Sequence, residues 1–309
     1  MRLDYLAALC GVLIALQGRA NGELSKYLHS SIQSALVSFI TGLIAVAAIS
    51  IFHPEIKEGM RKLRTALKNK ELPWWGIIGG MLGGTFISLQ SLLVPVVGVA
   101  VMSVGYIAGQ TAMSLVIDRI GLTGGGKKSI SVRRIFAAGL TIVSVIVAVW
   151  DKLDKSYLSL LTALLTIVSG LIVAVHRALN GRVNEITSQS FTTSLVNFVM
   201  GSIYLIVLFL IISLLGYTKW GSLPSGPWWI YTGGILGVLY IAFAAEVVQH
   251  IGVFHFTLFS VGGQLVGSLL LDFFAPTTNV GISNYLISGI VLTYIGVIAS
   301  GASNSRVQK

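Results

Sequence analysis

Three titratable side chains gather near the end of a long apolar run of the sequence. Glu246 is the only carboxylate well inside such a run, His250 follows it by about one helical turn, and His255 is close by. Ionisable groups are costly inside a bilayer, and those that occur there mark proton or ion pathways. Glu246 and His250 are therefore candidates for a proton-coupling site. The alternative is that the helix ends before Glu246, which would place this carboxylate at the membrane interface.

Six amide and imidazole side chains also fall in apolar runs or directly after them, at matching positions of the two halves of the chain. They are Gln17, Asn21, Gln110, His176, Asn180 and Gln264. Such a side chain can line a cavity and contact a substrate, or it can form a hydrogen bond between helices worth about 0.6–2 kcal/mol. Because histidine titrates near neutral pH, His176 is a candidate for proton coupling as well.

Two aspartates close apolar runs and are candidates for an interfacial or gating role. Asp118 is followed directly by Arg119, and Asp272 lies at the matching position of the second half. Charged side chains at the ends of membrane helices commonly pair with one another. We therefore expect an ion pair or a gate latch at these two positions.

Residue patterns typical of hydrolysis, metal binding or nucleotide binding are missing from the sequence. There is no His-Glu-x-x-His and no Gly-x-Ser-x-Gly, and the few acidic residues are scattered. The stretch 124–129 resembles a phosphate-binding loop, but it lacks the glycine spacing and a preceding strand, so we interpret it as a linker. We expect no catalytic residue, no metal and no cofactor.

The composition indicates that these polar groups are set in membrane helices. Of the 309 residues, 54% are apolar and 10% are charged, and the mean hydropathy is +0.85. Soluble domains average about 25% charged residues. A soluble enzyme, a disordered chain and a disulfide scaffold are excluded, the last because Cys10 is the only cysteine. The net charge of +10 comes from basic residues between apolar runs, so nucleic acid is not expected as a partner.

Ten apolar runs are long enough to cross a bilayer, which needs roughly 20 residues per helix. The predicted spans are 3–20, 30–52, 74–94, 98–118, 133–150, 157–178, 191–215, 228–248, 253–273 and 282–300. No in/out alternation is present, so the fold class is an all-α polytopic membrane protein. With ten spans, 16 of the 21 Lys and Arg residues fall on the side of the termini. The positive-inside rule then predicts cytoplasmic termini in the plasma (inner) membrane.

The loop between the second and third spans has a helical pattern of its own. Ile56, Met60, Leu63 and Leu67 recur at helical spacing among basic residues. This pattern predicts a short amphipathic helix that lies on the anionic inner leaflet, with membrane lipids as its partner.

The chain contains an internal repeat. The matching blocks are Asn21-Gly22 with Asn180-Gly181, Pro73-Trp74-Trp75 with Pro227-Trp228-Trp229, and Gly109-Gln110…Ser114-Leu115…Asp118 with Gly263-Gln264…Ser268-Leu269…Asp272. Between 73 and 118, 16 of 46 positions are identical to those 154 residues later. We therefore divide the chain into halves, 1–152 and 153–309. Each half has five spans, an odd number, so the second half is inverted, as in many secondary transporters.

With an Asn-Gly after the first helix, a Trp-rich entry to the third and the Gly-Gln…Ser-Leu…Asp block in the fourth, the sequence resembles the YdcZ-type (DUF606) branch of the drug/metabolite transporter (DMT) superfamily. The resemblance covers residues 1–300. It implies a fused two-repeat, EamA-like fold of ten helices with cytoplasmic termini. It also implies a central cavity lined by helices 1, 3, 4, 6, 8 and 9, but it does not supply a substrate.

We therefore expect a secondary active transporter that works by alternating access. The expected activity is proton-coupled export of a small organic metabolite or a drug-like cation. The expected partners are this small molecule, the proton and membrane lipids, and a homodimer is one assembly that the fold would allow. The competing hypotheses are a multi-span membrane enzyme and a flippase acting on a lipid-linked substrate, although an enzyme would need clustered catalytic groups.

Overall fold

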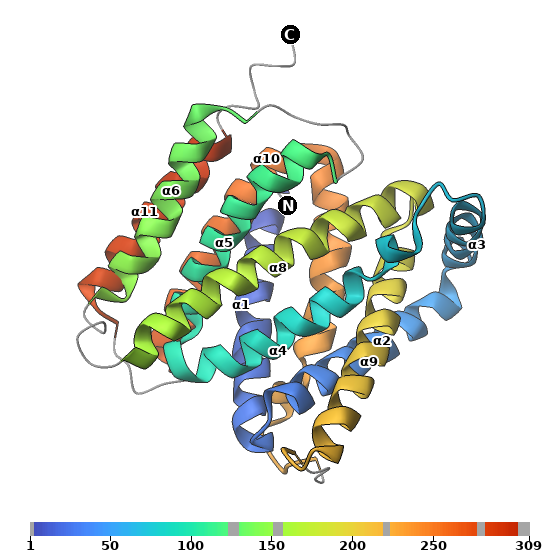
Figure 1. The fold of residues 1–309 in the computed structure, drawn as a ribbon, viewed down its shortest axis with the longest axis horizontal. Helices are drawn as coiled ribbons and strands as arrows, with labels where there is room; N and C mark the ends of the chain where they lie inside the picture. The colour runs from blue at the N-terminus through green and yellow to red at the C-terminus, as the bar shows by residue number, and fades with distance from the viewer. Residues whose placement is uncertain (1–2, 123–129, 151–156, 219–222, 277–281, 302–309) are drawn as a thin grey trace.

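The structure is a computed structural model that describes all residues except 1–2, 123–129, 151–156, 219–222, 277–281 and 302–309. The described chain is helical throughout and contains no strand (Figure 1), which confirms the all-α fold. Its elements are α1 (Leu3–Leu28), α2 (Ser31–Phe52), α3 (Glu55–Lys68), η1 (Trp74–Ile77), α4 (Gly79–Val97), α5 (Val99–Ile120), α6 (Val132–Ala148), α8 (Tyr157–Thr187), α9 (Ser190–Leu214), η2 (Trp228–Tyr231), α10 (Gly233–Phe274) and α11 (Asn284–Gly301). Among the described residues, seven helices are long and apolar enough to cross a membrane. The count of ten spans stays a prediction.

The first helix of each half is longer than the sequence predicts. Asn21-Gly22 and Asn180-Gly181 were expected to follow these helices, but α1 continues to Leu28 and α8 to Thr187. In α1 the extra turns are polar and are stabilised by an ion pair between Arg19 and Glu23, at 2.7 Å with i,i+4 spacing. Hydropathy therefore marks only the apolar part of each helix, not its end.

The amphipathic helix predicted between the second and third spans is present as α3. Most of its apolar face, however, is covered by protein, whereas the sequence predicted contact with lipid; Met60 stays 40% exposed. Leu63 and Ala66 form a buried cluster with Val183 of α8, and a Cβ atom at Gly59 would collide with Thr192 of α9. The apolar stripe of α3 is therefore explained by helix packing.

The two halves differ most where their third and fourth spans meet. In the first half, Pro95 and Gly98 separate α4 from α5, and Gly98 has a φ of +87°. In the second half the expected spans 228–248 and 253–273 form one continuous helix, α10. The residue that matches Pro95 is Gln249, which keeps the backbone N–H that proline lacks. The backbone is therefore helical through this point, without the non-helical turn that separates α4 from α5.

Helix α10 nevertheless doubles back, and Figure 1 shows it as two arms. Glycine contacts establish this. Gly233 packs on Asn21 and Gly237 on Gln17, so the first arm runs antiparallel to α1. In the second arm the order is reversed: Gly263 packs on Ala8 and Gly267 on Val12, parallel to α1. The first arm thus occupies the place of α4, and the second arm the place of α5.

Close contacts at glycines show the symmetry of the two halves. Gly11 of α1 packs on the backbone of Ser260 and Gln264, and the matching Gly170 of α8 packs on the matching Tyr106 and Gln110. Small residues allow such close approach of membrane helices. The same contacts made twice, by halves of opposite direction, are those of an inverted repeat.

The rim of the bundle carries apolar side chains that nothing in the described structure covers. α6 and α11 lie side by side at one edge (Figure 1), joined by a hydrogen bond between Ser144 and Thr293 at 2.6 Å. Side chains such as Phe136 on α6 and Leu214 on α9 are exposed. An extensive apolar surface of this kind is suited to lipid.

Candidate functional site

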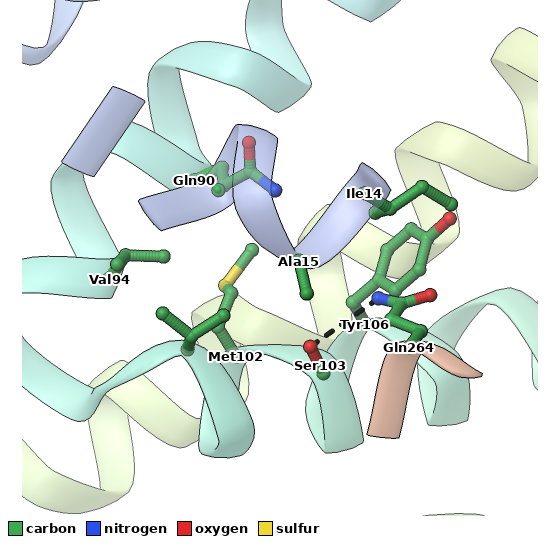
Figure 2. Close-up of a pocket in the computed structure, with 10 residues that line it drawn as sticks. Ile14, Ala15, Gln90, Val94, Met102, Ser103, Tyr106 and Gln264 are labelled. Atoms are coloured by element: carbon green, nitrogen blue, oxygen red, sulfur yellow. Dashed lines mark hydrogen bonds between the residues drawn. The ribbon is translucent and has the colours of Figure 1, made fainter. Parts of the chain in front are cut away.

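A small cavity lies between the two halves of the bundle. It is lined by α1, α4 and α5 of the first half and by the second arm of α10 (Figure 2), through Ile14, Ala15, Gly18, Gln90, Val94, Val99, Met102, Ser103, Tyr106 and Gln264. It has room for about one water molecule. In this conformation the site therefore offers very little space.

Six of the ten lining residues are apolar, and the amides of Gln90 and Gln264 and the hydroxyls of Ser103 and Tyr106 supply the polarity of the wall. Gln264 donates from Nε2 to Oγ of Ser103 at 3.4 Å, a long and weak bond. Across the cavity, Oε1 of Gln90 is buried without a hydrogen-bond partner among the described residues. Since an unpaired buried acceptor costs about 1–3 kcal/mol, Gln90 is poised to accept a hydrogen bond from a bound molecule.

One end of the cavity is closed at the start of α5. Asp272 of α10 accepts hydrogen bonds from the backbone N–H of Val99 at 3.0 Å and of Ala100 at 2.7 Å. A carboxylate at a helix N-terminus satisfies free N–H groups and the helix dipole. A Cβ atom at Gly98 would lie 2.8 Å from Oδ2 of Asp272, so glycine permits this approach.

The other end is closed by Tyr106, whose hydroxyl accepts a hydrogen bond from Nη2 of Arg177 at 2.5 Å. The guanidinium carbon lies 5.8 Å from the ring centroid of Tyr106 and 6.0 Å from that of Tyr240. Tyr240 belongs to the residues that pack near the N-terminal turns of α1. Arg177 therefore lies between the cavity and the end of the bundle that carries the N-terminus.

A second polar cluster lies between α8 and α9. Nε2 of His176 is 2.8 Å from Oδ1 of Asn197 and 2.8 Å from Nδ2 of Asn180, which also donates to Asn197 at 3.1 Å. Nε2 either donates to Oδ1 of Asn197 when it carries the proton or accepts from Nδ2 of Asn180 when it does not, but it cannot do both. When the proton is on Nε2, the buried Nδ1 has no partner among the described residues. The imidazole therefore has a free site at which a proton could bind.

The matching positions of the first half are packed in the same way with different chemistry. Gln17 lies against Gly237, as His176 lies against Gly83. Asn21 is fully buried against Gly233, and neither atom of its amide has a hydrogen-bond partner among the described residues. The histidine-centred cluster is thus specific to the second half.

Of the predicted cavity residues, the structure places only Gln264 in the wall of the cavity. Gln110 is half-buried elsewhere, and the other four lie in the two helix contacts just described. Asp118 forms an ion pair at 2.7 Å, but with Arg134 of α6 and not with the neighbouring Arg119. His250 is exposed on α10. The side chains of Glu246 and His255 lie outside the described part of the chain.

Sequence reasoning missed several residues of the site. Gln90 and Asn197 are amides inside apolar runs, and that signal could have found them. Tyr106 and Ser103 carry no such signal, because tyrosine and serine are common packing residues of membrane helices. Arg177 lies at the very end of the predicted span 157–178, so hydropathy does not mark it as part of the bundle.

Comparison with known proteins accords with this geometry. The family model DMT_YdcZ, described as "Putative inner membrane exporter, YdcZ", matches residues 4–147 and 161–299. The chain belongs to this family. The two matched segments correspond to the two halves of the YdcZ-type chain, as the internal repeat predicts. Family membership and the apolar helices indicate a multi-pass membrane protein and point to a transporter rather than an enzyme.

Solved structures agree on the fold. Eleven chains match, among them one described only as "Crystal structure of protein", with a TM-score of 0.57 and 14% sequence identity over 99% of this chain and 98% of that one. At this identity the likeness shows the fold alone. No curated protein matches the chain.

Proposed function

We propose that this protein is a proton-coupled secondary exporter of a small organic metabolite or drug-like compound, operating by alternating access between its inverted repeats. The carrying observation is that a small cavity lies between two halves whose helix contacts are otherwise repeated. Two halves of the same design can exchange conformations at similar energy, which opens the site to each side in turn.

The asymmetry of the cavity supports this mechanism. Gln264 lines it, whereas the matching Gln110 does not. If the halves exchanged conformations, Gln110 would come to occupy the place that Gln264 holds now. A site that only held a static ligand would have no need of this second, unused position.

Two groups could couple transport to protons. His176 is half-buried, with a buried Nδ1 that has no partner among the described residues, and Glu246 is a carboxylate within α10. A buried ionisable group whose neighbours change between conformations can bind a proton on one side and release it on the other. His250 remains a third candidate from the sequence.

Cysteine accessibility tests alternating access without knowledge of the cargo. Cys10→Ala removes the only cysteine, and Gln264→Cys or Gln110→Cys then places one thiol at either matched position. In vesicles of known orientation, reversing a pH gradient should speed labelling of one thiol by a membrane-impermeant reagent and slow that of the other. Phe136→Cys, on the exposed face of α6, is the control. Equal or gradient-independent labelling of both positions would reject the mechanism.

Counterflow in proteoliposomes tests transport itself. Compounds that stabilise the purified protein against heat are offered as radiolabelled cargo, and exchange should occur without net chemical change. Conversion of the compound would support an enzyme, and movement of labelled lipid between leaflets would support a flippase. Either of these results would overturn the proposal.

A further inference from the structure

Arg177 is a half-buried cation of α8 that has no role in the proposed mechanism so far. It lies ten residues before the end of α8 at Thr187 and reaches toward α5 and α10. None of the described carboxylates forms an ion pair with it. Its one described hydrogen bond is to the hydroxyl of Tyr106, although a guanidinium has five N–H donors.

This arrangement leaves the positive charge poorly compensated. Arginine keeps its proton in proteins, and removing an ion from water costs several kcal/mol unless a counter-charge and further hydrogen bonds offset the loss. Contact with the faces of two tyrosines returns about 0.5–2 kcal/mol each. Replacement by an apolar side chain would remove this cost, so an arginine retained here indicates a use for its charge.

The inverted repeat indicates where in the protein the charge of Arg177 acts. Arg177 matches Gly18, 159 residues earlier, and Gly18 lines the observed cavity. Ala15, another residue of the cavity wall, likewise matches Ala174. When the halves exchange conformations, the cavity forms from the matched set, and Arg177 enters its wall at the place of Gly18.

The other polar residues of the wall change in the same exchange. Gln264 is replaced by Gln110, so an amide is present in both states. Tyr106 is replaced by Ser260, and Gln90 by Ala244. Ser103 is replaced by Thr257. The second cavity therefore has one amide, two hydroxyls and a guanidinium, whereas the observed cavity holds no charged side chain.

We infer that Arg177 binds an anionic group of the cargo, and that the cargo is a small organic anion carrying a carboxylate, sulfonate or phosphate. The planar guanidinium of arginine can donate two parallel hydrogen bonds to two oxygens of such a group. In the observed conformation one N–H of Arg177 donates to the hydroxyl of Tyr106 instead. The observed cavity then contains only neutral polar groups. The anion is thus held strongly in one state and weakly in the other, as release requires. This inference rests on the proposed function and replaces the drug-like cation expected from the sequence.

The test is a panel of small carboxylates, sulfonates and phosphate monoesters, each matched with a neutral amide or alcohol and with a primary amine of the same carbon skeleton. Binding is measured by thermal stabilisation of the full chain in detergent, and transport by counterflow. The anions should stabilise the wild-type protein and be exchanged, and their amines should not. Arg177→Met should weaken anion binding at least tenfold, and Arg177→Lys should weaken it less because the charge remains without the fork.

Two measurements separate a binding role from a structural one. Arg177→Met should melt at the wild-type temperature or above, because an apolar side chain replaces a poorly compensated charge. Arg182→Met, which removes the same charge five residues later on α8, should leave anion binding unchanged. A lower melting temperature with unchanged anion affinity in Arg177→Met would overturn the inference.

Failure of this inference can be told from failure of the proposed function. If neutral compounds or amines are exchanged and anions are not, the anion site is wrong and transport stands. If labelling of Gln264→Cys and Gln110→Cys does not respond to the gradient, alternating access itself is wrong. A panel in which no anion stabilises the wild-type protein also overturns the anion site.

Discussion

Phe39 of α2 and Phe198 of α9 meet edge to face, with ring centroids 5.4 Å apart and ring planes at 63°. They match at the 159-residue offset of the repeat, so each is the other's counterpart. Each ring also packs on the glycine one turn after the other phenylalanine: Phe39 on Gly201, and Phe198 on Gly42. A contact between counterparts has to lie on the symmetry axis. The pseudo-two-fold axis therefore passes between α2 and α9.

Because both rings are buried on this axis, Phe39→Ala and Phe198→Ala should destabilise the protein by similar amounts. Each ring is 5% exposed or less, and removal of a buried phenylalanine costs about 3–5 kcal/mol. The measurement is unfolding in detergent, and the double variant should reveal a coupling of about 0.5–1.5 kcal/mol. Ile44→Ala, at a 63% exposed position of α2, is the control. Very unequal losses would argue against an axis at this contact.

The turn between α4 and α5 should be sensitive to any side chain at Gly98. Its φ of +87° is unfavourable for alanine, whose Cβ would also meet Oδ2 of Asp272 at 2.8 Å. Gly98→Ala is therefore expected to cost about 1–3 kcal/mol. Gly139→Ala is the matched control: no atom lies within 4 Å of its added Cβ in α6, and helix propensity predicts a gain of up to about 1 kcal/mol. Equal effects of the two substitutions would contradict this explanation.

Loss of the carboxylate of Asp272 should loosen the same end of the cavity. Asp272→Ala leaves the N–H groups of Val99 and Ala100 without their acceptor, at a cost of about 1–2 kcal/mol. We expect faster labelling of Gln264→Cys from the side on which α5 begins. An unchanged labelling rate with reduced stability would show that Asp272 is only a helix cap.

The fold could be predicted largely because its signals are local and repeated. Apolar runs mark membrane helices, and an odd number of spans per repeat forces inversion. The spans 228–248 and 253–273 predict a reversal of the chain near residue 250, and α10 doubles back there. That the backbone stays helical through the reversal could not be predicted, because Gln249 stands where the first half has Pro95. Whether such a segment breaks or bends depends on tertiary packing against α1.

The site was less predictable because its residues are defined by contacts between distant helices. Gln264 could be found as a polar group repeated in an apolar run. Arg177 could not be placed, since hydropathy ends the run at residue 178 while α8 continues to Thr187. The polar turns beyond the run are stabilised by packing on α3, which no local pattern reveals.

The ion pair between Asp118 and Arg134 should stabilise the contact of α5 with α6. The charged atoms are 2.7 Å apart, and both side chains are less than a fifth exposed. A double-mutant cycle with Asp118→Ala and Arg134→Ala should give a coupling of about 1 kcal/mol, above the 0.3–0.5 kcal/mol expected for the exposed pair of Glu58 and Lys62. The exchanged pair, Asp118→Arg with Arg134→Asp, should recover part of the loss. Additive single effects would show that the pair is incidental.

The proton-coupling residue can be identified by substitutions that keep the local hydrogen bonds. His176→Gln installs the residue that the first half has at the matching position, Gln17. Its amide can still pair with Asn180 and Asn197, but it cannot take up a proton on the site that Nδ1 of His176 offers. If His176 carries the proton, this variant should fold normally, exchange cargo in counterflow and lose cargo movement driven by a pH gradient.

Glu246→Gln is the parallel test of the carboxylate and should, if Glu246 carries the proton, abolish pH-driven transport in a folded protein. Removing a titratable group takes away the gradient's influence on the conformational equilibrium but leaves exchange of the loaded carrier intact. Each variant is assayed in proteoliposomes with and without a pH gradient, and His250→Gln is measured alongside them. The variant that loses the driven component and keeps exchange identifies the proton site. Full pH-driven transport in all three variants would mean that the carrier is not driven by these groups, and that proton coupling through α8 or α10 is wrong.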